Sequence, residues 1–330
     1  MSSKLSIILR KYSSPDDFKS VGDFLIEHFQ PENKDGNWLQ PAWEYMHGHP
    51  YLDESSLDKI GIWEDGGKIV SVVHYEHRLG EAFFEIHPDY LRLKPVMLEY
   101  AEDHLYAETG TGQKYLRAYV NESDLEFKAL VKSRGYAIAE QYTRPMLQFS
   151  ILQPLPEIHL PDGLQMKSLA EDNDLMKIHR VLWRGFNHPG DPPEEGIKDR
   201  AKMQSTPNFR KNLTIVVEAP NGDFASFCGM WYEPVNKIAY VEPVATDPDF
   251  RRMGLGKAAV CEGIRRCRDL GATVAFVGSD QEFYKSIGFM KIFDANCWIK
   301  YLQSGGPPRA HPPRCPPRAR QLQRALGRQG

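Results

Sequence analysis

The sequence has few cysteines, and their spacing excludes the usual cysteine-based sites. Five cysteines are spread over 330 residues, and no two of them form a C-x-x-C pair. An odd number of separated cysteines argues against a disulfide framework and favours free thiols, so we expect a cytoplasmic protein. His47 and His49 are the closest pair of histidines, but no further ligands stand at a recognisable spacing from them. We therefore expect no metal site and interpret this pair as part of a polar loop.

Long apolar segments are also missing. The mean hydropathy is -0.50, and no uninterrupted apolar run approaches the roughly 20 residues that span a bilayer. Residues 1–17 contain one short apolar stretch, which predicts a first strand and not a signal peptide. We therefore expect no membrane partner.

Outside the C-terminal segment, acidic residues outnumber basic ones. Residues 304–330 hold six arginines and no Asp or Glu, so the formal charge of -3 for the chain becomes -9 when these six are removed. An acidic body argues against nucleic acid as a partner, because phosphate binding needs a basic face. The segment also holds six prolines and two large aliphatic residues, so we expect it to be disordered. The alternatives are a basic docking tail and a read-through artefact.

The remainder of the chain repeats itself, which indicates a duplication. Four short segments of the first half recur in the same order in the second half, and three of them are separated from their counterparts by 155, 160 and 153 residues. The pairs are 9–17 with 166–172, 64–71 with 219–226, 86–90 with 246–250, and 132–136 with 285–289. The second pair reads as a hairpin in each half. A proline-bearing link near Gln153 predicts one domain over residues 1–153, a second over 154–303, and the tail from 304 to 330.

The strongest chemical signal is a glycine-containing loop between a predicted strand and a predicted helix. The strand covers about 238–246 and the helix about 255–270, and Arg251-x-x-Gly254-x-Gly256 lies at the start of the helix. Glycines allow a ligand to approach the backbone without obstruction by a Cβ atom. The free N–H groups and the dipole of the first helical turn favour an anion. The pattern therefore predicts a pyrophosphate site.

This loop resembles the acyl-CoA signature of the GNAT superfamily, Arg/Gln-x-x-Gly-x-Gly/Ala. Residues 283–289, Phe-Tyr-Lys-Ser-Ile-Gly-Phe, resemble the F-Y-x-x-x-G-F segment of the same family. The resemblance covers residues 160–300 well and 5–150 weakly. It implies an α/β fold of the α+β type with two GNAT-like domains, each a twisted mixed sheet flanked by helices, and a sheet that splays between its fourth and fifth strands. Pro243 suits such a break, since proline cannot donate to a ladder; an ordinary edge is the alternative.

The resemblance also implies acetyl-CoA, or another acyl-CoA, as cosubstrate and places it on one stretch of the chain. The residues expected to bind it are Val244, Ala245, Thr246, Arg251, Arg252, Met253, Gly254, Leu255, Gly256 and Lys257. An amine must be neutral to attack the thioester, so a base is useful, and an acid can protonate the departing thiolate. By its place in the motif, Tyr284 is the expected acid, with core packing as the alternative. Glu242, two residues before Val244, is the expected base, with a solvated strand position as the alternative.

The function expected on this basis is transfer of an acyl group, with acetyl as the expected group, from acyl-CoA to an amine of a small molecule. Residues 187–196 take the place of the variable acceptor loop, and Asp191, Glu194 and Glu195 could attract a cationic amine there; a solvated loop is the alternative. The acceptor, the acyl group and the choice between monomer and homodimer stay open.

Two other classes compete with a transferase. Gly254-x-Gly256-x-x-Ala259, with Asp280 about 20 residues on, also fits a dinucleotide-dependent oxidoreductase, although Asp247 to Met253 separate the glycines from the strand. A non-catalytic CoA-sensing module is the other alternative.

The first half is expected to be degenerate as a cofactor domain. Alignment of the repeats places Leu91, Lys94 and Val96 opposite Arg251, Gly254 and Gly256, and places Val131 opposite Tyr284. The glycines and the acid are thus missing, and Pro95 lacks an N–H group. The sequence therefore predicts one acyl-CoA for each chain.

Overall fold

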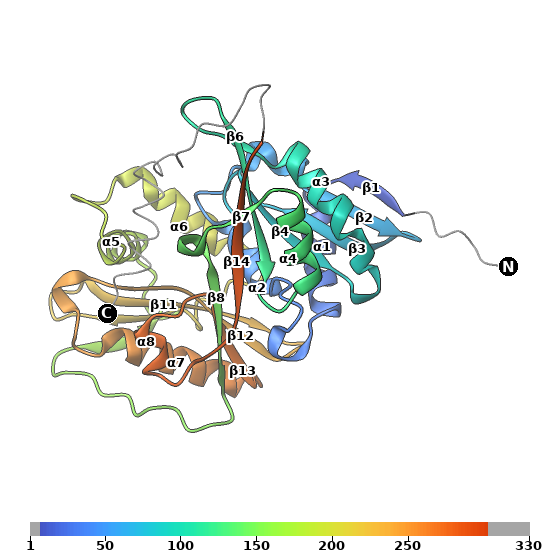
Figure 1. The fold of residues 1–330 in the computed structure, drawn as a ribbon. Coiled ribbons are helices and arrows are strands. Elements are labelled where there is room, and N and C mark those ends of the chain that lie inside the picture. Colours follow the sequence, from blue (N-terminus) through green and yellow to red (C-terminus); the bar gives the residue numbers. More distant parts are fainter. Residues whose placement is uncertain (1–6, 303–330) are drawn as a thin grey trace. The chain divides into compact units, whose positions relative to one another are not determined.

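A computed structural model describes residues 7–302 of the chain, which form two compact units (Figure 1). The first unit contains residues 7–46, 51–145 and 292–302, and the second contains 47–50 and 146–291. The predicted disordered tail, 304–330, lies outside the described residues. None of the described helices is long and apolar enough to cross a membrane.

The first unit is a mixed sheet in the order β1-β2-β3-β4-β6-β14, with the short β5 and β7 paired to β6 and β14. Its strands are β1 (Ile8–Lys11), β2 (Gly61–Asp65), β3 (Lys68–His74), β4 (Glu81–Ile86), β5 (Ala107–Glu108), β6 (Lys114–Asn121), β7 (Ala137–Ile138) and β14 (Met290–Leu302). Its helices are α1 (Asp16–Glu27), α2 (Gln40–Gly48), α3 (Lys94–His104) and α4 (Leu125–Ser133). The β4–β6 pair is parallel and the other pairs are antiparallel.

The second unit repeats this plan in the order β9-β10-β11-β12-β13-β8. Its strands are β8 (Arg144–Ser150), β9 (Gln165–Ser168), β10 (Ile215–Glu218), β11 (Phe224–Glu233), β12 (Ile238–Thr246) and β13 (Val274–Val277). Its helices are α5 (Leu175–Gly185), α6 (Ile197–Gln204), α7 (Leu255–Asp269) and α8 (Glu282–Lys285). Only β12 and β13 run parallel among these pairs of residues 144–277. The predicted mixed sheet flanked by helices is therefore confirmed for both units.

Alternation along β10 explains how two helices cover the second sheet. Ile215 and Val217 pack in the same apolar cluster as one side of α7, whereas Val216 packs in a separate cluster with α5. Successive side chains of a strand point to opposite faces, so α7 and α5 cover opposite faces of this sheet. Both helices also lie against the end of β12, where the glycine loop begins, because Gly185 of α5 lies beside Ala245 and Gly256 of α7 lies beside Thr246.

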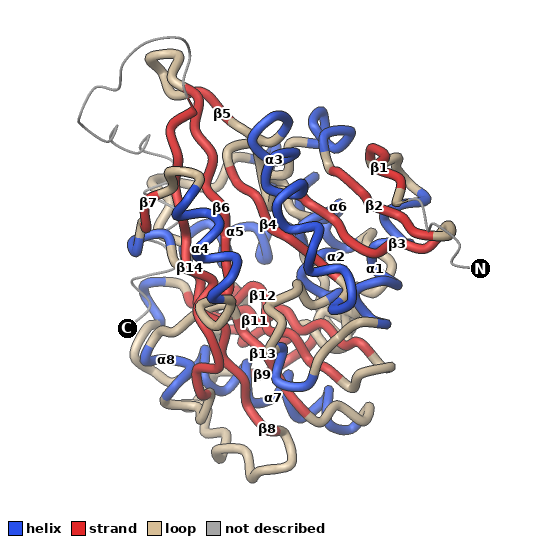
Figure 2. The backbone as a smooth tube through the Cα atoms, turned by 45° about the vertical axis from the view of Figure 1, so that its right-hand side comes forward, coloured by secondary structure: helices blue, strands red, loops and turns tan. Residues whose placement is uncertain are grey.

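The two units exchange their last strands. Strand β14 follows the second half of the chain but pairs with β6, along which it runs in Figure 2, over Ala295–Leu302. Strand β8 closes the first half but pairs with β13. The packed units therefore differ from the sequential division expected at residues 153 and 154. Alternating apolar residues set which face of a strand is buried, but they do not set which neighbour the strand joins.

Candidate active site

The glycine loop leads into a helix start that has no capping side chain. Gly254 takes the N-cap position of α7 in the left-handed region, at φ 79°, with no side-chain cap and no acidic residue in the first turn. The first bond into the helix runs from Ala258 N–H to the Gly254 carbonyl, at 2.9 Å. The N–H groups of Leu255, Gly256 and Lys257 precede this bond and have no intrahelical acceptor. They form a site with the donors and the dipole that an anion needs.

The two glycines of the motif serve different purposes. A Cβ atom on Gly254 would meet nothing within 4 Å, so this residue faces open space. A Cβ atom on Gly256 would lie 3.1 Å from the Thr246 hydroxyl and 3.3 Å from the Phe283 ring. Gly254 thus leaves room for a ligand and supplies a left-handed backbone, whereas Gly256 lets the helix pack closely against its neighbours.

Of the three cations in and after the loop, Arg251 has a structural role, whereas Arg252 and Lys257 lie where they can contact a ligand. The Arg251 guanidinium donates to the carbonyl oxygens of Gly185, at 2.8 Å, and Thr246, at 3.3 Å. It therefore joins the end of α5 to the end of β12, a contact that the sequence did not indicate. Arg252 is exposed and left-handed, at φ 66°, and Lys257 is half-buried beside the Ser286 carbonyl. These two side chains are the charges nearest in sequence to the uncapped helix start.

A buried carboxylate below the loop was missed by sequence reasoning. Asp247 accepts from Arg184 Nε at 2.6 Å and Nη2 at 3.0 Å, and it caps the 3-10 turn η6 (Pro248–Phe250) by accepting from the Asp249 N–H. Burial alone would raise the Asp247 pKa, but the bonds from Arg184 and Asp249 and the charges of Arg184 and Arg180 lower it below its ordinary value. The sequence did contain a signal for this ion pair. Asp247 and Asp249 flank a proline at the end of a predicted strand, and arginines lie on a helix that precedes it.

The sheet opens beside β12, as the resemblance predicted. Strand β12 pairs with β13 only from Ile238 to Tyr240, although β12 continues to Thr246. Its last residues, including Val244, Ala245 and Thr246, pair with β11 on the other side. Beyond Tyr240, β12 and β13 are therefore no longer paired, which is the opening between the fourth and fifth strands of this sheet.

Pro243 lies at a bulge in this strand. The register shifts between Cys228 and Met230 of β11, where Gly229 stands so close that a Cβ atom would lie 2.4 Å from the Glu242 carbonyl oxygen. The Trp231 indole donates to the same oxygen at 2.9 Å. The placement at a bulge agrees with the expectation for a proline inside a strand.

Tyr284 is buried on the short helix α8. Its ring packs edge-on against Phe283 at 4.8 Å and Phe289 at 5.9 Å between centroids. Burial, and secondly the charge of Glu242, raises the Tyr284 pKa well above its ordinary value. The hydroxyl is therefore protonated at neutral pH, as an acid requires, and the half-buried Glu242 carboxylate is near enough to act on it electrostatically.

The predicted acceptor segment is tied to α5 by two ring nitrogens. His179 Nε2 donates to the Pro193 carbonyl at 2.9 Å, and Trp183 Nε1 donates to the Gly190 carbonyl at 3.0 Å. Burial lowers the His179 pKa, so this ring is neutral near pH 7. The carboxylates of the segment, Asp191, Glu194 and Glu195, are exposed. Helix α5 thus holds the acceptor segment through His179 and Trp183. It holds the glycine loop through Arg184 and Gly185.

An uncapped helix start, a split sheet and a buried tyrosine thus lie along one stretch of the second unit, and the helix start can bind an anion. Residues 174–292 match the model of the Acetyltransferase (GNAT) family, so this part of the chain is a GNAT-family domain. The repeated plan of the two units agrees with the duplication that the repeats predicted.

Relatives and solved structures agree with this assignment. The chain is 27% identical to a mycothiol acetyltransferase from Thermomonospora curvata over 53% of its own length, and the match spans 60% of that relative. It is 25% identical to a mycothiol acetyltransferase from Paenarthrobacter aurescens over 69% of this chain and 72% of the relative. Its fold is shared, at a TM-score of 0.61 and 14% identity, with a GCN5-related N-acetyltransferase from Sphaerobacter thermophilus, covering 91% of this chain and 96% of that one.

The same fold is found in a tandem GNAT protein from the clavulanic acid biosynthesis pathway, again at a TM-score of 0.61 and 14% identity, covering 92% of this chain and all of the other. None of these comparisons supports the dinucleotide-dependent alternative or the non-catalytic one.

Proposed function

We propose that this protein is an N-acetyltransferase that moves an acetyl group from acetyl-CoA to an amine of a small molecule. The uncapped start of α7 carries the proposal, because three N–H groups and the open space above Gly254 fit a pyrophosphate and nothing in the first turn repels it. Acetyl-CoA, when bound, supplies the activated thioester.

The residues that would hold the donor follow from the site. The N–H groups of Leu255, Gly256 and Lys257 would bind the pyrophosphate, with Arg252 and Lys257 adding charge. Val244, Ala245 and Thr246 would bind the pantetheine amides through the part of β12 that extends beyond its pairing with β13. Met253 is exposed beside the loop, and Leu255 is buried below it.

Two side chains of this chain would move the protons. Glu242 would take a proton from the incoming ammonium group, directly or through a water molecule, so that the amine becomes nucleophilic. Tyr284 would give its hydroxyl proton to the departing sulfur, which its raised pKa permits because the proton is retained until then. Arg251, Arg184 and Asp247 would position the loop without touching either substrate.

We expect a small acceptor that is cationic in solution. The acidic body of the chain and the exposed Asp191, Glu194 and Glu195 support this expectation. Because the curated relatives are mycothiol acetyltransferases, a mycothiol-type amine belongs first among the acceptors to be tried.

The acceptor prediction can be tested with a panel of amines, aminoglycosides, amino acids and acidic metabolites, with products measured by mass spectrometry. We expect turnover of cationic amines. Replacement of Asp191, Glu194 and Glu195 by their amides should raise the KM for the acceptor by about 2- to 10-fold at low salt, since exposed charges each contribute little and are screened. Glu126→Gln, an exposed change in the first unit, is the control. Turnover confined to acidic or uncharged acceptors would contradict the electrostatic argument.

The corresponding helix start in the first unit is already filled. Lys94, opposite Gly254 in the repeat, forms an ion pair with Asp124 and lies 5.5 Å from the centre of the Phe127 ring. Pro95 occupies the first turn of α3 and has no N–H group to offer. Lys94 therefore neutralises a carboxylate of its own unit, its backbone N–H is bonded to the Leu91 carbonyl, and Pro95 removes a further donor that an anion site would need.

We therefore expect one acetyl-CoA for each chain. Titration calorimetry of the full-length protein should give a stoichiometry close to one. The Gly254→Val variant should then show no binding, because the first unit offers no substitute site. Two sites of similar affinity in the unaltered protein would overturn this interpretation of the duplication.

A further inference from the structure

The two units can be compared position by position around their first helices. Helices α1 and α5 bury the same four positions, with each residue of α5 lying 157 positions further along the chain. The matched residues are Val21 with Ile178, Gly22 with His179, Phe24 with Val181, and Leu25 with Leu182. A basic residue of the first strand pairs with an acid of the next in both units, as Arg10–Glu64 and as Lys167–Glu218.

In the second unit, arginines fill the space between α5, the β10–β11 turn and η6. Arg180 lies 3.1 Å from the Asp223 carboxylate of the turn. Arg184 lies 2.6 Å from Asp247 and 2.7 Å from Asp249. Two guanidinium groups thus form ion pairs with three carboxylates there.

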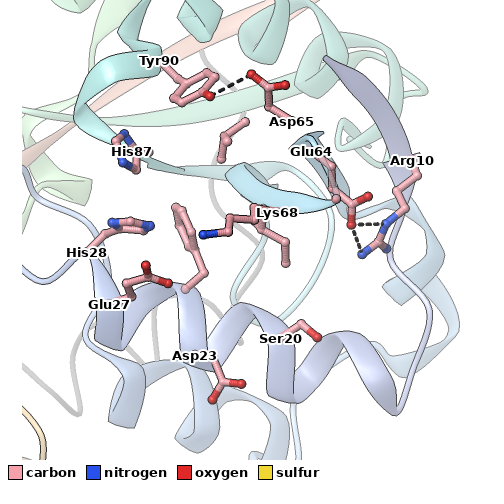
Figure 3. A pocket seen from close by; sticks show the side chains of 14 residues that line it. Arg10, Ser20, Asp23, Glu27, His28, Glu64, Asp65, Lys68, His87 and Tyr90 are labelled. Carbon is pink, nitrogen blue, oxygen red and sulfur yellow. Dashed lines mark hydrogen bonds and ion pairs between the residues drawn. The ribbon is translucent and has the colours of Figure 1, made fainter. Parts of the chain in front are cut away.

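In the first unit, the charge is reversed at three of the four matched positions, a histidine stands at the fourth, and the space is open. Asp23 and Glu27 replace Arg180 and Arg184 by the same spacing of 157, while Lys68 and His87 replace Asp223 and Asp247. A pocket of about 390 Å³ lies between α1, the β2–β3 hairpin and η3 (Pro88–Leu93) (Figure 3). The side chains of Asp23 and Glu27 are shorter than those of arginine, so they leave open the space that Arg180 and Arg184 occupy in the second unit.

The pocket carries an excess of negative charge. Four carboxylates line it, from Asp23, Glu27, Glu64 and Asp65, against the two lining cations Arg10 and Lys68. Asp23 also forms an exposed ion pair with Lys19 along α1, which a ligand would have to displace. Burial, and secondly the charge of His87, lowers the His28 pKa, so this histidine adds no charge near pH 7. Figure 3 draws no ion pair from Lys68 to the other lining side chains. Arg10 is already bound to Glu64 and to Asp17.

One of these carboxylates lacks a donor. Asp65 is 7% exposed; its Oδ2 accepts from the Tyr90 hydroxyl at 2.8 Å, whereas its Oδ1 has no hydrogen-bond partner among residues 7–302. A buried carboxylate oxygen without a donor is unfavourable, and a cation in the adjoining pocket would lower this cost through its charge, without contacting the oxygen.

We propose that this pocket binds the guanidinium group of a small ligand, in the place that Arg180 and Arg184 occupy in the second unit. A planar guanidinium can donate to Asp23 and Glu27, one helical turn apart, and can stack on an imidazole. The His28 and His87 rings, 4.4 Å apart between centroids, offer such a surface. The volume suits a small molecule. The site is independent of acetyl transfer, because its lining residues belong to the first unit.

The experiment is a titration of the full-length protein with L-arginine amide, followed by calorimetry and by NMR. Butylammonium and inorganic phosphate serve as matched ligands. The Asp23→Arg/Glu27→Arg variant restores the side chains of the second unit, and both positions are exposed, so the fold should persist. We expect the Kd for arginine amide to rise at least 10-fold in this variant, and to be unchanged in Glu99→Arg, an exposed helical control with the same change of charge at one site.

A second variant shows whether the pocket prefers a cationic or an anionic ligand. Lys68→Met removes a competing cation, so arginine amide should bind more tightly, whereas an anion would bind more weakly. Acetyl transfer should be unaltered in each variant. Absence of binding at 50-fold excess over protein at roughly millimolar concentration, equal binding of phosphate, or unchanged affinity in the double variant would each overturn the proposal.

Discussion

Replacing Gly254 with valine is expected to abolish acetyl-CoA binding, with a loss of at least about 100-fold in affinity. The residue has φ 79°, which a β-branched side chain resists, and its Cβ position faces the open space before the N–H groups of α7. Hydrogen bonds to a charged group contribute about 1.5–3 kcal/mol each, so obstruction of two or three of them accounts for this loss. Titration calorimetry with acetyl-CoA is the measurement.

Gly112→Val is the matched control for backbone strain. Gly112 has the same φ of 79° and also faces open space, but it lies in a turn of the first unit. The control should lose a comparable amount of stability and keep its affinity for acetyl-CoA. If Gly254→Val bound acetyl-CoA like the unaltered protein, the pyrophosphate site would lie elsewhere.

Tyr284→Phe is expected to lower kcat by about 10²–10⁴-fold with little change in the KM for acetyl-CoA. The phenyl ring retains the edge-on packing against Phe283 and Phe289, so the variant removes only the hydroxyl that would protonate the leaving sulfur. Steady-state rates of product formation, with the acceptor identified by the panel, give both constants.

Tyr136→Phe removes a buried hydroxyl from the first unit and should leave kcat unchanged. Single-turnover rates separate chemistry from product release, so that a slow release step does not conceal the effect. An unaltered single-turnover rate in Tyr284→Phe would assign Tyr284 to packing alone.

The elements nearest the site could be predicted because their signals are local. The strand expected over 238–246 is β12, and the helix expected over 255–270 is α7. Both expected hairpins are present as β2–β3 and β10–β11. Apolar periodicity and glycine-containing turns act over a few residues, so the sequence alone carries them.

Features that depend on distant partners could not be predicted. Nothing around Arg251 shows that its guanidinium joins the Gly185 carbonyl, 66 residues away in the chain. The motif likewise does not distinguish Gly254, which faces open space, from Gly256, which Phe283 covers. The sequence around Lys94 likewise does not show that this residue forms an ion pair with Asp124. Each of these depends on which segments meet in space.

The exchange of β8 and β14 has a consequence for biosynthesis. The first unit receives one strand from far along the chain, since Ala295–Leu302 pair with Lys114–Asn121. Pairing across so long a stretch of chain is slow, and until it occurs β6 has an edge open to foreign strands. During synthesis this edge of β6 therefore stays open at least until residues 295–302 have been made. Gene fragments that end near residue 153 should yield insoluble product, and any ancestral single-domain protein with this exchange would have closed its sheet only as a strand-swapped dimer.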